Sequence, residues 1–211
     1  MVALGELVVH AGPTIDKPFF AWSIHHQSHS WFSLMKYATQ VGYKWTAWGS
    51  MVTAAVLLTF IWQRHRWLPA VAIVSMILSE HFLTIALNHT FHRPGPPGSG
   101  GTFPSGGTDR AFAFYGLIAY LLWREVSRRR TGAVICTTIV AALGFNEAYS
   151  RLYLAVHWLT DVVSGTIWGC LLAITFITIV RVLAGPPGAP EDAALPVRLP
   201  DWSRNRPEVP A

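Results

Sequence analysis

The residues from Ser150 to Asp161 read Ser-Arg-Leu-Tyr-Leu-Ala-Val-His-Trp-Leu-Thr-Asp, and the rest of the chain is interpreted outward from this stretch. Asp161 follows His157 by four residues, so on a helix both side chains would lie on one face. A carboxylate there can hold one imidazole nitrogen and leave the other free to attack phosphorus. Arg151 and the Ser150 hydroxyl could bind phosphoryl oxygens as negative charge develops on them.

The alternative interpretation is structural: a His/Asp pair that satisfies itself at the end of a membrane helix, as many such pairs do. Two further segments favour a catalytic role for this pair. Phe91-His92-Arg93-Pro94 places an arginine just after an apolar run, and Phe103-Pro104-Ser105-Gly106-Gly107-Thr108 opens the next run.

In this order and spacing, the three segments resemble the type 2 phosphatidic acid phosphatase superfamily of membrane lipid phosphatases, over about residues 38–183. That family carries Lys, six residues, Arg-Pro; then Pro-Ser-Gly-His; then Ser-Arg, five residues, His, three residues, Asp. The third motif matches at every defining position. The resemblance implies His157 as the nucleophile and Asp161 as its orienter. It implies these phosphate ligands: Arg93, Ser105, Gly106 and Arg151.

The chain departs from the family at two positions. The lysine of the first motif is Ala86, and the histidine of the second motif, which is the general acid in the family, is Gly107. Neither role can be carried over to these residues. His89 and His92 could replace the acid, although histidines in surface loops are commonly only solvated. Four other polar residues could contribute to the site or bond to a neighbouring helix: Arg110 and Ser150 as accessory phosphate contacts, Glu80 and Glu147 as polar partners.

The composition is that of an integral membrane protein: 52% of the 211 residues are apolar, 13% are charged, and ten are tryptophan. We predict an all-α bundle with five membrane spans, each close to the roughly 20 residues that cross a bilayer. These runs cover residues 45–62, 67–87, 106–123, 132–149 and 158–182.

Three segments follow from this pattern. Residues 1–44 are too polar for a span, so the apolar patches at 18–22 and 31–35 are predicted to form helices lying in the membrane interface. Residues 45–184 would form the transmembrane domain. Residues 185–211 hold seven of the fourteen prolines and are predicted to be a disordered tail.

Arginines in short loops predict the topology, because such loops remain cytoplasmic. They follow the first, third and fifth runs: Arg64, Arg66, Arg124, Arg128, Arg129, Arg130 and Arg181. The loops with Arg93 and Arg151 would then both face outward. We expect a protein of the bacterial plasma membrane with its active site outside and its C-terminus in the cytoplasm. The net charge of +5 reflects this bias and indicates anionic lipid headgroups, not nucleic acid, as the charged partner.

Together these features predict a phosphatase that hydrolyses a lipid phosphate or diphosphate through a phosphohistidine. A polyprenyl diphosphate is favoured, because Gly107 removes the acid that a poor leaving group needs. No metal or cofactor is expected, since arginines can stabilise the charge, and Cys136 and Cys170 lack metal-ligand spacing. A lipid phosphotransferase would use the same residues. A catalytically weak lipid-phosphate binding or transport protein is the alternative from another class. The oligomeric state is not predicted.

Overall fold

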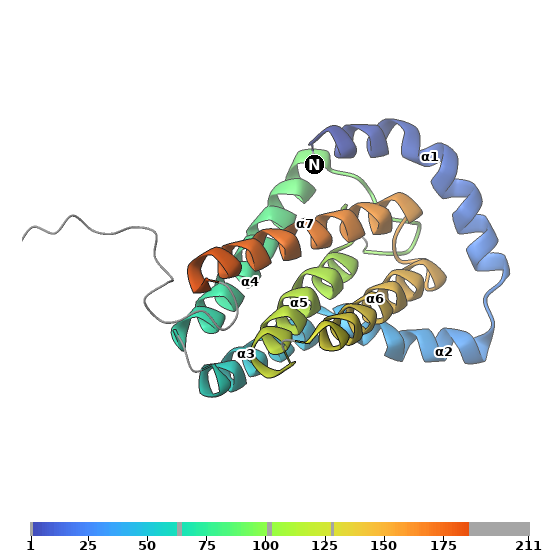
Figure 1. Ribbon diagram of the computed structural model, residues 1–211. Coiled ribbons are helices and arrows are strands. Elements are labelled where there is room, and N and C mark those ends of the chain that lie inside the picture. Colours follow the sequence, from blue (N-terminus) through green and yellow to red (C-terminus); the bar gives the residue numbers. More distant parts are fainter. Residues whose placement is uncertain (1, 63–64, 101–102, 128, 186–211) are drawn as a thin grey trace, which may run out of the picture.

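A computed structural model describes residues 2–62, 65–100, 103–127 and 129–185. The described residues form helices and connecting turns, with no strand among them, which confirms the predicted all-α bundle (Figure 1). The elements are α1 (Val2–His25), α2 (His29–Ala38), a 3-10 turn η1 (Thr39–Gly42), α3 (Lys44–Ile61), α4 (Trp67–Phe91), α5 (Gly106–Leu122), a π-helical turn η2 (Trp123–Ser127), α6 (Arg130–Tyr153) and α7 (Leu159–Ala184). The predicted tail covers residues 185–211, and all of it except Gly185 lies outside the described residues.

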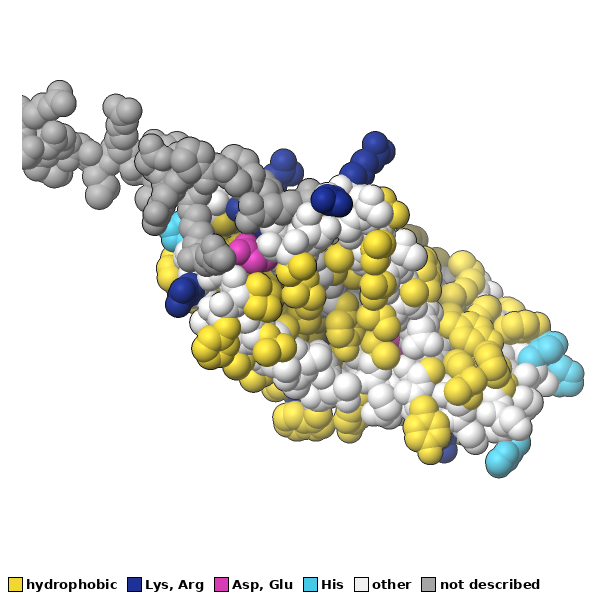
Figure 2. All heavy atoms as spheres, turned by 60° about the horizontal axis from the view of Figure 1, so that its bottom comes forward, with side chains coloured by type: hydrophobic (Ala, Val, Ile, Leu, Met, Phe, Trp, Pro, Cys, Tyr) yellow, Lys and Arg dark blue, Asp and Glu magenta, His cyan; other side chains and the backbone are white. Residues whose placement is uncertain are grey.

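Among the described residues, four helices are long and apolar enough to cross a membrane: α3, α4, α6 and α7. The fifth predicted span, α5, has 17 residues and continues into η2. Figure 2 shows hydrophobic side chains over much of one face of the molecule, as expected where helices meet lipid. The chain is therefore an integral membrane protein.

α5 is the central helix of the bundle. Its side chains at Ala113, Phe114, Leu117 and Leu121 are fully buried against α3, α4 and α7. Small residues let the helix backbones approach, as in other membrane bundles. A Cβ added at Gly165 of α7 would lie 2.6 Å from the carbonyl oxygen of Ser105. This close approach fixes the start of α5 against the start of α7.

The N-terminal region differs from the prediction in the length of its first helix. In place of a short helix at 18–22, α1 is one helix of 24 residues that continues through Pro13 and Pro18. It bends along its length (Figure 1), which is expected where proline removes a backbone hydrogen bond. α1 is not among the helices apolar enough to span. Its interfacial position remains a prediction.

α1 runs across one end of the bundle (Figure 1). Its first turns approach the end of α4, where Gly5 faces the ring of Phe91. Near its end, the Ser23 hydroxyl donates to the Leu152 carbonyl of α6 at 2.9 Å. Between these contacts it lies against the start of α7. The N-terminal helix therefore covers the end at which the motif-bearing loops meet.

Candidate active site

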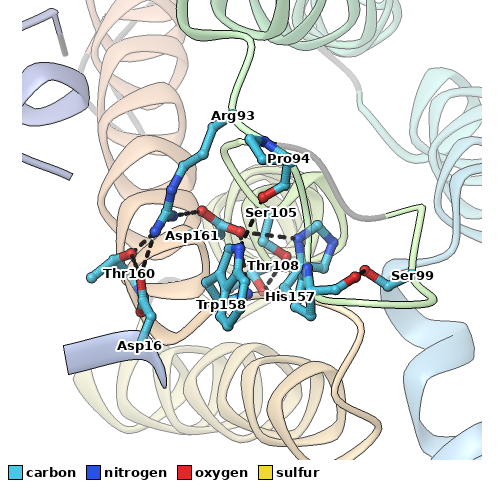
Figure 3. A network of polar contacts seen from close by, with 11 residues as sticks. Asp16, Arg93, Pro94, Ser99, Ser105, Thr108, His157, Trp158, Thr160 and Asp161 are labelled. Carbon is cyan, nitrogen blue, oxygen red and sulfur yellow. Dashed lines mark hydrogen bonds and ion pairs between the residues drawn. The ribbon is translucent and has the colours of Figure 1, made fainter. Parts of the chain in front are cut away.

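The three motif segments meet at this end of the bundle (Figure 3). Arg93 follows α4, Ser105 precedes α5, and His157 and Asp161 lie at the junction of α6 and α7. The backbone amide of Ser105 donates to the Asp161 carbonyl at 3.0 Å, which ties the second segment directly to the third. Their proximity agrees with the prediction that these segments share one side.

His157 lies in a turn rather than on a helix, contrary to the helical spacing assumed from sequence. α6 ends at Tyr153, and Ala155 has a left-handed backbone with φ 54°. α7 begins at Leu159, so Asp161 is in its first turn and accepts the Trp158 amide at 3.2 Å. The turn still brings the pair together. His157 Nδ1 lies 3.8 Å from Asp161 Oδ2, beyond hydrogen-bond length, and is buried without a partner among the described residues.

Arg93 is held by two carboxylates (Figure 3). Its Nη1 donates to Asp161 Oδ1 and its Nη2 to Asp16 Oδ2, and both carboxylates are 1% exposed. Its Nη1 also donates to Thr160 Oγ1 at 2.9 Å. One Asp161 oxygen, Oδ1, therefore binds Arg93, and the other, Oδ2, faces His157. A predicted phosphate ligand is engaged by acidic side chains in this state.

Asp16, on α1, was not recognised in the sequence. It accepts the Thr160 amide at 3.0 Å and the Thr160 hydroxyl at 2.7 Å, so it also caps the start of α7. A Cβ at Gly12 would lie 2.9 Å from Arg93 Nη2. The glycine one turn before Asp16 thus leaves room for the guanidinium. In the sequence, Asp16 is marked only as a single carboxylate four residues after a glycine.

The N-terminus of α5 faces two further arginines. The first amides of a helix, here those of Gly106, Gly107 and Thr108, have no carbonyl partner within it, which suits an anion. A Cβ at Gly106 would lie 3.1 Å from Arg110 Nη1, and one at Gly107 would lie 2.5 Å from Arg151 Nη2. Both guanidinium groups therefore lie beside this helix start.

These two arginines also carry buried carboxylate partners. Arg110 Nη1 donates to Glu80 Oε1 at 2.9 Å. Glu80, the polar residue of the second predicted span, therefore pairs with an arginine that closely follows the second motif. Arg151 Nε donates to Glu147 Oε1 at 2.6 Å. Glu147 also accepts the Thr39 hydroxyl and the Gly42 amide, each at 3.1 Å. It is fully buried and anchors both Arg151 and the η1 turn.

Of the remaining predicted residues, His92 shares a pocket with the residues around Arg93. The Ser150 hydroxyl donates to the Glu147 carbonyl of its own helix at 2.8 Å. His89 and His92 are exposed at the end of α4, with ring centroids 6.3 Å apart. His92, Arg93 and Trp158 line a pocket of about 300 Å³ beside α1. Ala86 is exposed on α4. No cluster of three or more His, Cys, Asp or Glu that could hold a metal ion occurs within the described part of the chain.

A His/Asp pair, a helix N-terminus and three arginines lie together at one end of the bundle, so the chain is a helical membrane protein with a charged polar site at that end. Comparison with known proteins specifies it further. The PAP2 superfamily profile matches residues 15–183, and the chain belongs to that superfamily. The match begins well before residue 38, where the resemblance in sequence was placed, and it includes Asp16.

One solved structure is similar in fold. The crystal structure of the first transmembrane PAP2-type phosphatidylglycerolphosphate phosphatase from Bacillus subtilis superimposes with a TM-score of 0.76 at 20% sequence identity. The aligned region covers 84% of this chain and 90% of that one. No curated protein sequence matched the chain.

Proposed function

We propose that this protein is a membrane phosphatase that hydrolyses a lipid diphosphate, with His157 as the nucleophile. The observation that carries the proposal is the order Arg93–Asp161–His157, in which one carboxylate joins a cation to a buried imidazole. Family membership supports a lipid phosphate substrate. The reaction would take place at the outer face of the membrane, as the arginine-rich loops predict.

In the first step, His157 Nε2 attacks phosphorus while the bond from phosphorus to the leaving oxygen breaks. The imidazole becomes cationic, and Asp161 stabilises it at Nδ1 once their 3.8 Å separation closes to a hydrogen bond. The α5 amides at Gly106 and Gly107, with Arg151, bind the phosphoryl oxygens. Water then hydrolyses the phosphorus–nitrogen bond, which releases phosphate and restores His157.

The leaving group decides the substrate class. A monoester expels an alkoxide, which needs a proton, whereas a diphosphate expels a phosphate group with a pKa of about 6. Position 107 has no side chain to donate a proton, and the neighbouring Glu147 is paired with Arg151. A polyprenyl diphosphate therefore fits this site better than phosphatidic acid or phosphatidylglycerol phosphate.

One experiment tests both the proposed substrate class and the proposed nucleophile. Detergent-purified protein is given polyprenyl diphosphate, phosphatidic acid and phosphatidylglycerol phosphate, and phosphate release is measured. Acid-labile, base-stable labelling of the protein by a ³²P substrate reports the phosphohistidine. We expect release and labelling to be greatest with the diphosphate and absent from His157→Ala. Turnover by folded His157→Ala protein would reject the mechanism.

A further inference from the structure

α1 and α7 enclose an apolar groove of about 380 Å³, within the range of roughly 300–1,000 Å³ typical of ligand sites. Leu7, Ala11 and Ile15 line it from α1, and Val163 and Ser164 line it from α7. Leu7 and Ile15 are more than half exposed, although α1 is not apolar enough to span the membrane. The groove thus presents hydrocarbon surface that no described element covers.

The groove is continuous with the lipid-facing surface of α7. Val163, Ile167, Leu171 and Ile174 are exposed and follow one another at helical spacing, so they form one apolar stripe along the helix. Val163 belongs to both the stripe and the groove. A hydrocarbon chain lying on this stripe could enter the groove without crossing polar surface.

The other side of the groove reaches the candidate active site. Gly12 and Thr160 line the groove and also lie against the Arg93 guanidinium, which donates to Thr160 Oγ1 at 2.9 Å. A molecule that fills the groove therefore ends one residue away from Arg93, which the family resemblance predicts to be a phosphate ligand. A lipid with a phosphate at the end of its chain has this arrangement of groups.

Ser164 supplies an independent indication of a ligand. It lines the groove and is fully buried, and its hydroxyl has no hydrogen-bond partner among the described residues. A buried hydroxyl without a partner is costly, and a ligand oxygen would remove that cost. Its position, one turn after Thr160, is where the oxygen-bearing end of a lipid chain would lie.

We propose that the groove between α1 and α7 binds the hydrocarbon chain of the lipid substrate, with the Ser164 hydroxyl donating to the first oxygen that follows the chain. This inference rests on the proposed function for the identity of the headgroup. It adds that the enzyme recognises chain length through α1. Substrates with a chain long enough to fill the groove bind more tightly than a headgroup with one isoprene unit.

The test fills the groove and compares two substrates. Val163→Phe narrows the groove, and Val140→Phe is its matched control. Val140 lines a separate apolar groove of about 330 Å³ with Tyr120 and Trp123, which lie at the opposite end of α5 from the candidate site. For each protein, kcat/KM is measured with a long-chain polyprenyl diphosphate and with isopentenyl diphosphate.

We expect Val163→Phe to lower kcat/KM for the long chain at least about tenfold, because loss of contact with two methylene groups has roughly that effect. Activity on isopentenyl diphosphate should not change, and Val140→Phe should match the wild type on both. Ser164→Ala should lower kcat/KM for both substrates by a similar factor, because both carry the oxygen that follows the chain. A Val163→Phe protein with wild-type long-chain kcat/KM, or one that loses both activities equally, would overturn the groove assignment.

Equilibrium binding of the polyprenyl diphosphate separates this inference from the proposed function. If the wild type binds the lipid but hydrolyses neither substrate, the phosphatase proposal fails. The groove assignment then depends on whether Val163→Phe weakens binding while Val140→Phe does not. Equal binding by all three proteins would reject the groove.

Discussion

The Glu147 carboxylate occupies the space that a side chain at Gly107 would need. A Cβ built on Gly107 would lie 2.5 Å from Glu147 Oε1 and 2.6 Å from Arg151 Nε. Both groups are ends of side chains, but they form an ion pair, and Glu147 also accepts hydrogen bonds from Thr39 and Gly42 of η1, so moving them breaks these interactions. The position at which the family carries a histidine is therefore closed by an ion pair from α6.

This relationship predicts that Gly107→His alone will not supply the missing acid. We expect it to destabilise the protein by about 1–3 kcal/mol through overpacking and to lower activity on every substrate. Glu147→Ala should also destabilise, because Arg151 loses its partner. The double variant should lose about 1 kcal/mol less stability than the sum of the losses of the two single variants, since each change relieves the other. Thermal unfolding of the four proteins measures this coupling.

Activity gives the second readout of the same cycle. In the double variant Arg151 has lost the ion pair that holds it, so its guanidinium can move away from the imidazole at position 107. Only this protein should therefore gain monoester hydrolysis relative to diphosphate hydrolysis. Strictly additive stabilities, or a gain already present in Gly107→His, would show that Glu147 does not close the position.

The wild type should prefer diphosphates to monoesters by a wide margin, because no donor side chain at position 107 assists an alkoxide. His89→Ala and His92→Ala serve as controls, since both histidines are exposed at the end of α4. We expect neither to change the ratio of the two rates. A monoester preference that collapses in either variant would instead identify that histidine as the replacement acid.

Asp161→Asn should lower kcat by about 10²–10⁴ and leave substrate binding largely intact. An amide neither stabilises the His157 imidazolium nor fixes its tautomer, as in other His/Asp pairs. Asp161 also pairs with Arg93, so the midpoint of thermal unfolding of the Asp161→Asn protein must be compared with that of the wild type. A midpoint near wild type with lost turnover supports the orienting role; wild-type kcat contradicts it.

We propose that Asp16, which is paired with Arg93, competes with substrate for the guanidinium. Such competition predicts opposite effects of an Asp16 substitution on stability and on binding. Asp16→Asn removes a buried charge partner and should destabilise the protein by about 1–3 kcal/mol. Because the guanidinium is then less occupied, KM for the lipid phosphate should fall several-fold with kcat little changed. Ser23→Ala, which removes a different contact of α1, is the matched control. A higher KM in Asp16→Asn would mean that Asp16 positions Arg93 for substrate.

The sequence predicted the helices and the motif segments because both depend on local patterns. Hydropathy marked the five helices predicted as spans but not the full length of α1, and the spacing of residues 150–161 marked His157 and Asp161. The sequence indicated Glu147 as a residue that lines the site or bonds to a neighbouring helix, without naming Arg151 as its partner, and it did not indicate Asp16. Asp16 meets Arg93 across 77 positions of the chain, and only the fold brings them together. The local helix spacing was misleading at His157, where a left-handed turn at Ala155 sets the geometry.

The sidedness of the site can be tested with single cysteines in a protein whose Cys136 and Cys170 are replaced by serine. Pro97→Cys lies in the exposed loop before α5, and Thr131→Cys lies exposed at the start of α6. Arginines at 124 and 128–130 should keep the second position in the cytoplasm. An impermeant thiol reagent added to intact cells should therefore label Pro97→Cys, and label Thr131→Cys only after permeabilisation. The reverse pattern would place the active site in the cytoplasm and exclude outer-leaflet lipids as its substrates.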